Sequence, residues 1–306
     1  MQKHEIYYCP PVFRPPSEAH SLLIQLTEGC TYKCDFCIPY LKKDFIVRDT
    51  DEVIKDLDVA KKIYGPGVKR IFFLDGNAMV TPTEKLLDVT RYAYETFPKL
   101  ERVSVYAHSK DILKKSEKQL KNLSEAGLKL AYLGFESGYN ELLKMVNKQV
   151  TKENHIEASK KLMKANITLS ATFINGLGGG NNPELSEKHA IESAELINKI
   201  CPDDDRIWYV AFLTLMIPPG TVIFKKRSKD LFQEMNTTEI LEELKIFIQN
   251  IDFHNKNANC IFRSNHASNY LPIKGILDKE KESILSTIKY GLTHSEILRS
   301  EFYRGL

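Results

Sequence analysis

Long apolar segments are missing from this sequence. The longest apolar run extends from Tyr209 to Ile217, whereas a helix that crosses a bilayer needs about 20 apolar residues. The first residues, from Met1 to Ile6, contain no apolar core of a secretory signal. We therefore expect a cytoplasmic protein that has no membrane partner.

An excess of charge of either sign is also missing. The 306 residues include 43 Lys and Arg against 40 Asp and Glu, which leaves a net charge of +3. This balance argues against a nucleic-acid partner without excluding one, because nucleic-acid-binding surfaces are usually basic. The chain is 42% hydrophobic, so it has enough apolar material for one large core or two modest ones, and general disorder is excluded.

Cysteine is scarce. Six cysteines in a chain of 306 residues are too few for a disulfide scaffold. In a reducing compartment, cysteines that lie close together are expected to bind a metal or to take part in catalysis. Three of the six, Cys30, Cys34 and Cys37, lie close together in the sequence, and the other three are scattered along the chain.

Six short runs rich in branched and aromatic residues predict buried strands. These runs are residues 22–26, 70–74, 103–106, 128–135, 167–174 and 207–215. Between them, apolar residues three and four apart predict amphipathic helices around 53–63 and 86–93 and at 110–125, 140–147, 152–164 and 184–199. This alternation predicts an α/β fold with a parallel sheet, either open and doubly wound or closed as a barrel. Loops after the carboxyl ends of the strands are then expected to form the functional site.

The regular alternation ends after Pro218. A basic stretch from Lys225 to Arg227 follows, and then a predicted helix at 238–252, a strand at 259–263 and a final helix from about residue 278. We expect residues 1–217 to form the core domain, with a short N-terminal lead-in, and residues 218–306 to form a C-terminal extension packed on it.

The three clustered cysteines directly follow the first predicted strand, with the spacing Cys-x3-Cys-x2-Cys. An iron–sulfur cube ordinarily takes four thiolates, so three thiolates leave one iron open to an exogenous ligand. Zinc is an alternative, because Cys34-x2-Cys37 has the spacing of a zinc knuckle. A second knuckle is missing from the sequence, however, and Cys9 or His20 would have to supply the fourth ligand. A third alternative is that the cysteines are buried and inert.

This motif, with Phe36 before its last cysteine, resembles the signature of the radical S-adenosylmethionine (radical SAM) superfamily. The segment from Gly134 to Gly138 resembles the branch that contains the oxygen-independent coproporphyrinogen oxidases and Elp3-like enzymes, and other segments resemble a group of short iron–sulfur oxidoreductases. The resemblance covers about residues 20–217. It implies a partial (β/α)6 TIM-like barrel of parallel strands with a C-terminal α-rich extension.

The resemblance also implies cofactors and chemistry. Cys30, Cys34 and Cys37 would be the metal ligands that hold a [4Fe-4S] cluster, whose open iron binds SAM through the amino and carboxylate groups of SAM. An electron from the reduced cluster would cleave SAM to methionine and a 5′-deoxyadenosyl radical, which abstracts hydrogen from the substrate. A low-potential electron donor such as flavodoxin or ferredoxin is therefore an expected partner.

Seven residues are expected to bind the SAM cofactor. They are Phe36, Asp75, Gly76, Asn77, Glu136, Ser170 and Gly176. In the superfamily a Gly-Gly-Glu-like turn follows the second strand, and here residues 75–77 depart from that pattern and would have to replace it. Glu136 is expected to accept hydrogen bonds from the ribose hydroxyls. The alternatives are an ordinary turn at 75–77, a carboxylate at a helix N-terminus for Glu136 and local hydrogen bonding for Ser170.

Five polar residues are candidates for binding the substrate. They are His108, which ends the third predicted strand, and Arg263, Asn265, His266 and Asn269 in the extension. They would bind a polar or anionic substrate at the mouth of the barrel. Alternatively, the extension residues form caps and turns that close the fold, and His108 is a hydrogen-bonded core histidine. The sequence identifies no catalytic side chain.

We therefore expect a radical SAM Fe-S oxidoreductase that acts on a small-molecule substrate, because we see no appended RNA-binding module after the barrel. The first alternative is an enzyme that modifies tRNA or a peptide, in which residues 225–227 and the extension would hold a polymer. The second is a noncatalytic zinc or iron–sulfur protein that uses its metal for stability or sensing.

Overall fold

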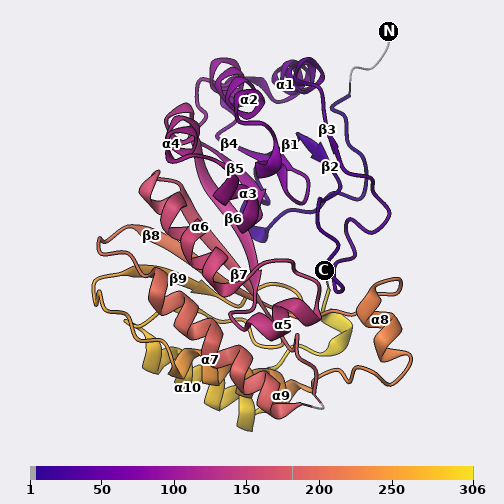
Figure 1. The fold of residues 1–306 in the computed structure, drawn as a ribbon, viewed down its shortest axis with the longest axis vertical. Helices are drawn as coiled ribbons and strands as arrows, with labels where there is room; N and C mark the ends of the chain where they lie inside the picture. The colour runs from indigo at the N-terminus through magenta and orange to yellow at the C-terminus, as the bar shows by residue number, and fades with distance from the viewer. Residues whose placement is uncertain (1–4, 181, 306) are drawn as a thin grey trace. The chain divides into compact units, whose positions relative to one another are not determined.

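The computed structural model of the chain describes residues 5–180 and 182–305. Its main sheet has eight strands in the order β1-β4-β5-β6-β7-β8-β9-β10, and helices alternate with most of them along the chain (Figure 1). The pairs β1–β4, β4–β5, β5–β6, β7–β8 and β8–β9 are parallel, whereas β10 is antiparallel to β9. The α/β class with a mostly parallel sheet is therefore confirmed, and seven of the eight strands of this sheet, all except β10, are those predicted from the sequence.

The strands are β1 (Leu22–Gln25), β2 (Thr27–Glu28), β3 (Ile46–Val47), β4 (Arg70–Leu74), β5 (Arg102–Ala107), β6 (Leu128–Glu136), β7 (Thr168–Asn175), β8 (Ile207–Thr214), β9 (Asn259–Arg263) and β10 (Lys274–Ile276). Of these, β2 and β3 form a separate antiparallel pair. The helices are α1 (Thr50–Tyr64), α2 (Thr83–Thr96), α3 (Ser109–Lys114), α4 (Glu117–Ala126), α5 (Asn140–Met145), α6 (Lys152–Lys164), α7 (Pro183–Ile200), α8 (Val222–Arg227), α9 (Thr237–Gln249) and α10 (Lys281–Thr293).

The chain forms two compact units, each built from separate segments. Unit 1 consists of Met1–Lys33, Pro39–Leu133 and Ala158–Leu169, and unit 2 consists of Cys34–Ile38, Gly134–Glu157 and Ser170–Leu306. Unit 1 therefore contains β1, β4, β5 and most of β6. Unit 2 contains the end of β6, most of β7, and all of β8, β9 and β10.

In unit 1, helices pack beside strands that are buried along most of their length. Helices α1 and α2 lie next to each other, and α2 also contacts α4 (Figure 1). Ile24 of β1, Phe72 of β4 and Val105 of β5 are fully buried, as are Leu57 of α1 and Leu86 of α2. Near-continuous apolar runs of this kind are typical of parallel strands that are covered on both faces.

Unit 2 has an aromatic core. The rings of Phe173 in β7 and Phe212 in β8 stack with their centroids 5.2 Å apart, and Phe247 of α9 lies 4.5 Å from Phe212. Helix α9 contacts both α7 and α10 (Figure 1). Residues of the C-terminal part of the chain thus contribute to this core.

One helix predicted from the sequence needs correction. The predicted helix at 110–125 is divided into α3 and α4, because Ser116 is extended and caps α4: its Oγ accepts a hydrogen bond from the Gln119 N–H, and the Gln119 side chain accepts one from the Ser116 N–H. The extension adds to the sheet the predicted strand at 259–263, which is β9, and also β10, which was not predicted. The short helix α8 was not predicted.

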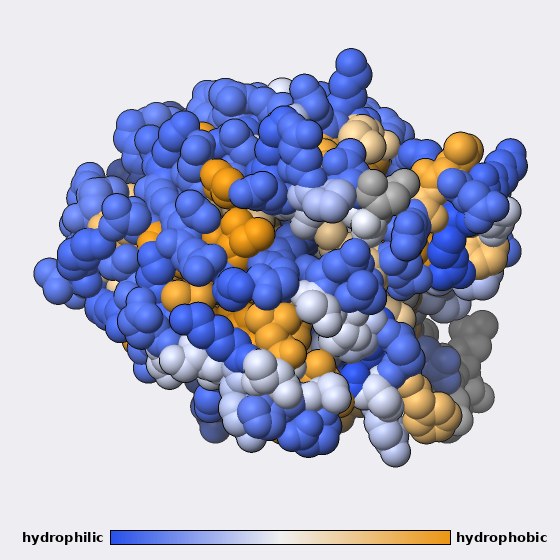
Figure 2. Space-filling view, turned by 90° about the horizontal axis from the view of Figure 1, so that it is seen from below, coloured by the Kyte–Doolittle hydropathy of each residue, from blue (hydrophilic) through white to orange (hydrophobic). Residues whose placement is uncertain are grey.

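The face of the protein shown in Figure 2 is predominantly polar. Hydrophilic residues cover most of the face shown in Figure 2, and apolar residues reach that face in small groups. Within residues 5–180 and 182–305, no helix has both the length and the hydropathy needed to cross a membrane.

Candidate functional site

The carboxyl end of β4, in unit 1, carries a buried carboxylate. Asp75 Oδ2 accepts hydrogen bonds from Lys43 Nζ at 2.8 Å, from Gln25 Nε2 at 3.2 Å and from the Gly29 N–H at 3.2 Å. The Asp75 N–H donates to Thr27 Oγ1 at 3.0 Å. Burial raises the pKa of Asp75 above its ordinary value, although its hydrogen bond to Lys43 opposes this effect. The other oxygen, Oδ1, is buried and has no hydrogen-bond partner among the described residues.

A second polar group in unit 1 fixes the residues that follow Cys30. Asn77 is buried, and its Nδ2 donates to Asp111 Oδ2 at 2.7 Å and to Thr31 Oγ1 at 3.0 Å, while its Oδ1 accepts from the His108 N–H at 3.1 Å. The Tyr32 hydroxyl donates to Asp111 Oδ2 at 3.0 Å, and the Tyr32 ring stacks on the His108 ring with centroids 3.6 Å apart. Thr31 and Tyr32 are thus held against the ends of β4 and β5.

The cysteine loop, which we define as residues 29–45, connects β2 with β3. Cys30 is half-buried and belongs to unit 1, whereas Cys34, which is buried, and Cys37, which is half-buried, belong to unit 2. The Cys37 N–H donates to the Cys34 carbonyl at 3.1 Å, so Asp35 and Phe36 are the central residues of a turn. No three His, Cys, Asp or Glu side chains of the described residues are gathered as ligands of one metal ion, and the three cysteine ligands therefore stay a prediction.

Gly76, the middle residue of the expected cofactor turn, lies close to the cysteine loop. A Cβ atom at Gly76 would overlap the ring of Tyr40, which is itself buried. Glycine at this position is therefore explained by the close approach of the loop, independently of any ligand.

Glu136, in unit 2, ends β6 in an uncommon conformation. Its φ of +64° lies in the left-handed region, which few residues other than glycine adopt. Its carboxylate pairs with Lys148 Nζ at 2.8 Å, and the two side chains are only 10% and 9% exposed. A Cβ atom at Gly134 would collide with the Glu136 carboxylate. The position of this carboxylate is therefore set by its lysine partner and by the absence of a side chain at Gly134.

The turn after β7 is bound to helix α9. Gly176 has a φ of +78°, and its N–H donates to Glu243 Oε1 at 2.7 Å. The second oxygen of Glu243 accepts a hydrogen bond from Ser186 Oγ at 2.5 Å. The preceding residue, Asn175, is buried, and its Oδ1 has no hydrogen-bond partner among the described residues.

A buried polar chain links the end of β6 to this turn. His189 Nδ1 lies 2.7 Å from Ser137 Oγ, and His189 Nε2 lies 3.7 Å from Glu243 Oε1. Burial lowers the pKa of His189 to about 4, and burial raises the pKa of Glu243 to about 7. Since all three side chains are buried, they hold the segments that follow β6 and β7, and they are closed to a substrate.

Two of the substrate candidates in the extension are hydrogen-bonded within unit 2. Asn269 Nδ2 donates to the Phe212 carbonyl at 2.7 Å, and its Oδ1 accepts from Thr214 Oγ1 at 3.0 Å. His266 Nδ1 lies 2.9 Å from Ser268 Oγ. Asn269 therefore ties the extension to the carboxyl end of β8.

The remaining predicted residues differ in exposure. Arg263 is exposed, with its guanidinium carbon 5.7 Å from the ring centroid of Tyr209, and Asn265 is also exposed. Ser170 is buried within β7. His108 is buried, and its Nδ1 accepts a hydrogen bond from the Lys110 N–H at 3.3 Å.

Sequence reasoning missed several polar residues at these strand ends. They are Lys43, Asp111, Lys148, His189 and Glu243. Their partners lie at a distance in the sequence, from 12 residues for Lys148 and Glu136 to 67 residues for Glu243 and Gly176. A lone histidine at His189 within an otherwise amphipathic helix is the one signal that the sequence offered.

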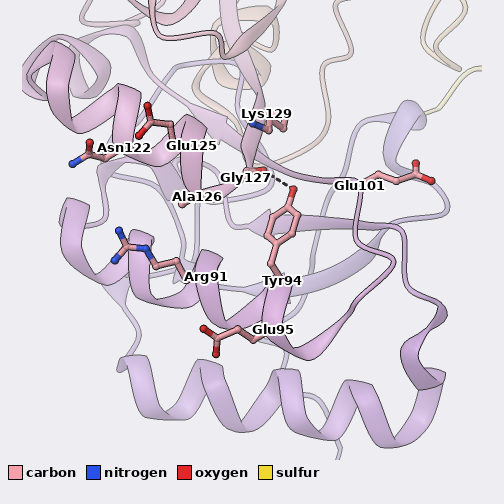
Figure 3. A pocket seen from close by; sticks show the side chains of 9 residues that line it. All are labelled: Arg91, Tyr94, Glu95, Glu101, Asn122, Glu125, Ala126, Gly127 and Lys129. Atoms are coloured by element: carbon pink, nitrogen blue, oxygen red, sulfur yellow. Dashed lines mark hydrogen bonds between the residues drawn. The ribbon is translucent and has the colours of Figure 1, made fainter.

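A hollow in unit 1 lies elsewhere, at the amino ends of β5 and β6. It is lined by Arg91, Tyr94, Glu95, Glu101, Asn122, Glu125, Ala126, Gly127 and Lys129 (Figure 3). Glu101 directly precedes β5, and Lys129 is the second residue of β6. Because these are the opposite ends of the strands from Asn77 and His108, the hollow is not part of the candidate site.

Comparison with known proteins shows which family the sequence matches. The family model described as "Radical SAM superfamily" matches residues 24–188, more than half of the chain. In an alignment of 238 residues, the sequence is 28% identical to tRNA-2-methylthio-N(6)-dimethylallyladenosine synthase from Pelagibacter ubique, and the alignment covers 74% of this chain and 50% of that protein. In an alignment of 192 residues, it is 26% identical to ribosomal protein uS12 methylthiotransferase RimO from Acidovorax sp., and the alignment covers 54% of this chain and 39% of that protein.

The fold is also similar to that of solved structures. Coproporphyrinogen III oxidase (HemN) from Escherichia coli, described as a radical SAM enzyme, aligns with 75% of this chain and 52% of its own, with a TM-score of 0.53 and 14% identity. At that identity the likeness concerns the fold alone. The chain spans about half the length, or less, of the curated relatives that it matches.

Proposed function

The chain belongs to the radical SAM superfamily, and from this membership we propose that Cys30, Cys34 and Cys37 supply the three thiolate ligands of a [4Fe-4S] cluster. One observation carries the proposal. The three cysteines have the spacing Cys-x3-Cys-x2-Cys in the loop after β2, inside the matched segment 24–188, and the other three cysteines of the chain lie outside that segment.

Enzymes of this superfamily use a [4Fe-4S] cluster and SAM. When bound, these groups would supply the one-electron cleavage of SAM to methionine and a 5′-deoxyadenosyl radical, and thereby the means of abstracting hydrogen from the substrate. The chain's own residues bind and orient these groups, and a low-potential donor such as flavodoxin or ferredoxin is proposed to supply the electron.

The donor chemistry of the site fits these cofactors. Thiolates are the usual ligands of iron–sulfur clusters. Two buried acceptors, Asp75 Oδ1 and Asn175 Oδ1, have no hydrogen-bond partner among the described residues, and buried acceptors are normally satisfied. SAM carries amino, hydroxyl and adenine N–H donors. We propose that Asp75 accepts from the amino group and that Asn175, next to Gly176, accepts from the adenine.

Glu136 is proposed to accept hydrogen bonds from the ribose hydroxyls. Its ion pair with Lys148 at 2.8 Å keeps a negative charge in a buried place, and a charged acceptor forms stronger hydrogen bonds than a neutral one. Phe36, Gly76, Asn77 and Ser170 remain proposed cofactor contacts on the basis of the family resemblance.

An assay of SAM cleavage tests the proposal. After anaerobic reconstitution, we expect the wild-type protein to contain iron and sulfide and to form 5′-deoxyadenosine with dithionite. Cys34→Ala should lose most of the iron and the product. Cys201→Ala is the matched control, because Cys201 is also buried but lies outside the matched segment. Zinc without sulfide in the wild-type protein, or equal product from Cys34→Ala, would contradict the proposal.

The substrate is proposed to be a small molecule. Two residues of the basic stretch are engaged in ion pairs, Lys226 with Asp35 and Arg227 with Glu234, which leaves less free positive charge for a polymer. The alternative, modification of tRNA or a peptide, is supported by the names of the curated relatives, which act on tRNA and on a ribosomal protein.

Binding of bulk tRNA separates these two possibilities. For a small-molecule enzyme we expect weak binding with little dependence on salt. An enzyme that binds several phosphates of tRNA should have an affinity for tRNA that is about a thousandfold or more lower at physiological salt than at low salt. Filter binding across a salt series measures the slope, and tight, strongly salt-dependent binding would favour the tRNA alternative.

A further inference from the structure

The turn that carries Cys34 and Cys37 is fixed through its two central residues. Asp35 donates its backbone N–H to the Val146 carbonyl at 3.0 Å and accepts the Ile223 N–H at its own carbonyl at 3.1 Å. Backbone groups on both sides of the Asp35 Cα are therefore bonded to other parts of unit 2, namely the residue after α5 and the first turn of α8. A turn that is anchored in both directions has little freedom to rotate.

The Asp35 side chain adds a third contact. Its Oδ2 lies 2.7 Å from Lys226 Nζ, and the same ammonium group lies 3.4 Å from the Met145 carbonyl. Lys226 therefore bridges the turn and the end of α5, which Figure 1 shows next to α8. The Asp35 side chain is 13% exposed and that of Lys226 is 40% exposed, so solvent weakens this ion pair only in part.

The second central residue is held by apolar contact. Phe36 packs against a buried group that consists of Leu142, Val146, Ile174, Leu177, Leu185, Leu215, Ile217 and Ile223. Phe224 of α8 packs against the same group. Helix α8 thus reaches the turn through a backbone donor, a charged side chain and a shared apolar core.

Helix α8 contains a built-in control for the role of Lys226. Thr221 caps the helix by accepting the Phe224 N–H at 3.1 Å. Adjacent residues of a helix point in different directions. Lys225 is exposed, whereas the neighbouring Lys226 is half-buried against Asp35. Two adjacent residues of the same type therefore differ in whether they contact the turn.

We propose that Lys226 and helix α8 position the Cys34–Cys37 turn, so that a segment from the C-terminal part of the chain orders two of the three thiols before any metal binds. This inference rests on the proposed function in one respect, namely that Cys34 and Cys37 are cluster ligands. Lys226 is a positioning residue and acts through Asp35. Lys226 is in this view an internal contact of the fold and not part of a surface for a polymer.

Amide hydrogen exchange of the metal-free protein tests the positioning role without any cofactor. Three amides report on the anchor, those of Asp35, Cys37 and Ile223, because each donates one of the hydrogen bonds described. In Lys226→Gln we expect these amides to exchange about two- to fivefold faster than in the wild type, the range set by a partly exposed ion pair. In Lys225→Gln, which removes the same charge from the same helix, they should keep the wild-type rates.

Two further variants show whether Asp35 and Lys226 act together. Asp35→Asn should match Lys226→Gln, and the double variant should exchange no faster than either single variant. High salt should reduce the difference between Lys226→Gln and the wild type. Equal exchange in Lys226→Gln and Lys225→Gln, or additive effects in the double variant, would overturn the proposal.

Iron uptake then separates this inference from the proposed function. After anaerobic reconstitution we expect Lys226→Gln to retain about two- to fivefold less iron and sulfide than Lys225→Gln at limiting iron. A wild-type protein that takes up no iron would overturn the proposed function, while a faster exchange confined to Lys226→Gln would still support the positioning role. Normal iron uptake by Lys226→Gln with unchanged exchange would overturn the positioning role alone.

Discussion

Burial shifts the pKa values of His189 and Glu243 in opposite directions. The pKa of His189 falls from 6.5 to about 4, and the pKa of Glu243 rises from 4.5 to about 7. For Glu243, folding is favoured while the carboxyl is protonated, so its contribution is complete below pH 4.5 and is lost as the pH rises toward about 7. For His189, folding is favoured while the ring is neutral, so its contribution is complete above pH 6.5 and is lost as the pH falls toward about 4.

The two contributions nearly cancel in the wild type, and single substitutions should reveal each of them. In Glu243→Gln, the free energy of unfolding should fall as the pH is lowered from 6.5, by an amount on the order of 3 kcal/mol. In His189→Asn, it should instead fall as the pH is raised from 4.5 to about 7. Denaturant unfolding across this range measures both slopes. Because each variant keeps only one of the two titratable groups, slopes of the opposite sign would contradict the stated direction of its pKa shift.

Variants of Glu136 and Lys148 should separate an effect on the free energy of unfolding from an effect on SAM binding. Removing either partner of a buried ion pair leaves the other charge uncompensated, so Glu136→Gln and Lys148→Gln should each lower the free energy of unfolding by about 3 kcal/mol. Only Glu136→Gln should also weaken SAM binding, by about tenfold or more, with unchanged iron content. Equal loss of SAM affinity in both variants would remove Glu136 from direct contact with the cofactor.

At the scale of single residues, the sequence indicates the family motifs more clearly than it indicates which side chains contact one another. The cysteine motif and Glu136 are recognisable because their spacing and neighbours in sequence are distinctive. The partners of the predicted residues are not recognisable in the sequence. The fold brings Lys43 beside Asp75 and Glu243 beside Gly176. Asn269 shows the same limit, because its partners Phe212 and Thr214 lie 57 and 55 residues away in the sequence.

Helix ends show how closely the elements depend on single residues. Gly127 follows α4 with a φ of +114°, and a Cβ atom there would collide with the ring of Tyr94. The Tyr94 hydroxyl points at this residue and donates to its carbonyl at 3.1 Å (Figure 3). Gly65, after α1, has a φ of +67°, but no atom lies within 4 Å of the position of its Cβ.

Alanine at these two positions should therefore have different costs. Gly65→Ala should lower the free energy of unfolding by about 1 kcal/mol, because an L-residue is strained at positive φ. Gly127→Ala should cost about 2 kcal/mol more, because the collision with Tyr94 is added to that strain. Thermal and denaturant unfolding of the two variants measure the difference. Equal losses would show that the Tyr94 ring moves aside without cost.

Most elements were predictable because their signals are local. The seven predicted strands agree with the structure within one residue at each end, since buried parallel strands appear as short apolar runs between polar segments. The break between α3 and α4 was missed, because apolar spacing continues across Ser116 while its capping box stops the helix. Helix α8 is too short for a periodic pattern, and β10 depends on pairing with β9.

At the scale of the whole molecule, sequence order and compact units do not coincide. Unit 2 combines Cys34–Ile38 from the early part of the chain with segments that extend to the C-terminus. The proposed boundary between core and extension at residue 217 falls inside this unit and stays a prediction. Long-range contacts such as Asp35 with Lys226 leave no trace in local composition, which is why the sequence suggested a simple division.

The parallel pairing of β8 with β9 has a practical consequence for solubility. Five residue pairs, from Ile207 with Asn259 to Ala211 with Arg263, join the two strands. A chain cut after residue 217 would leave this side of β8 as an open edge with unpaired N–H and C=O groups, which invites aggregation. We expect light scattering to detect large particles in the shortened protein and none in the full chain. Pairing with β9 thus covers an edge of β8 at which copies of the chain could otherwise associate.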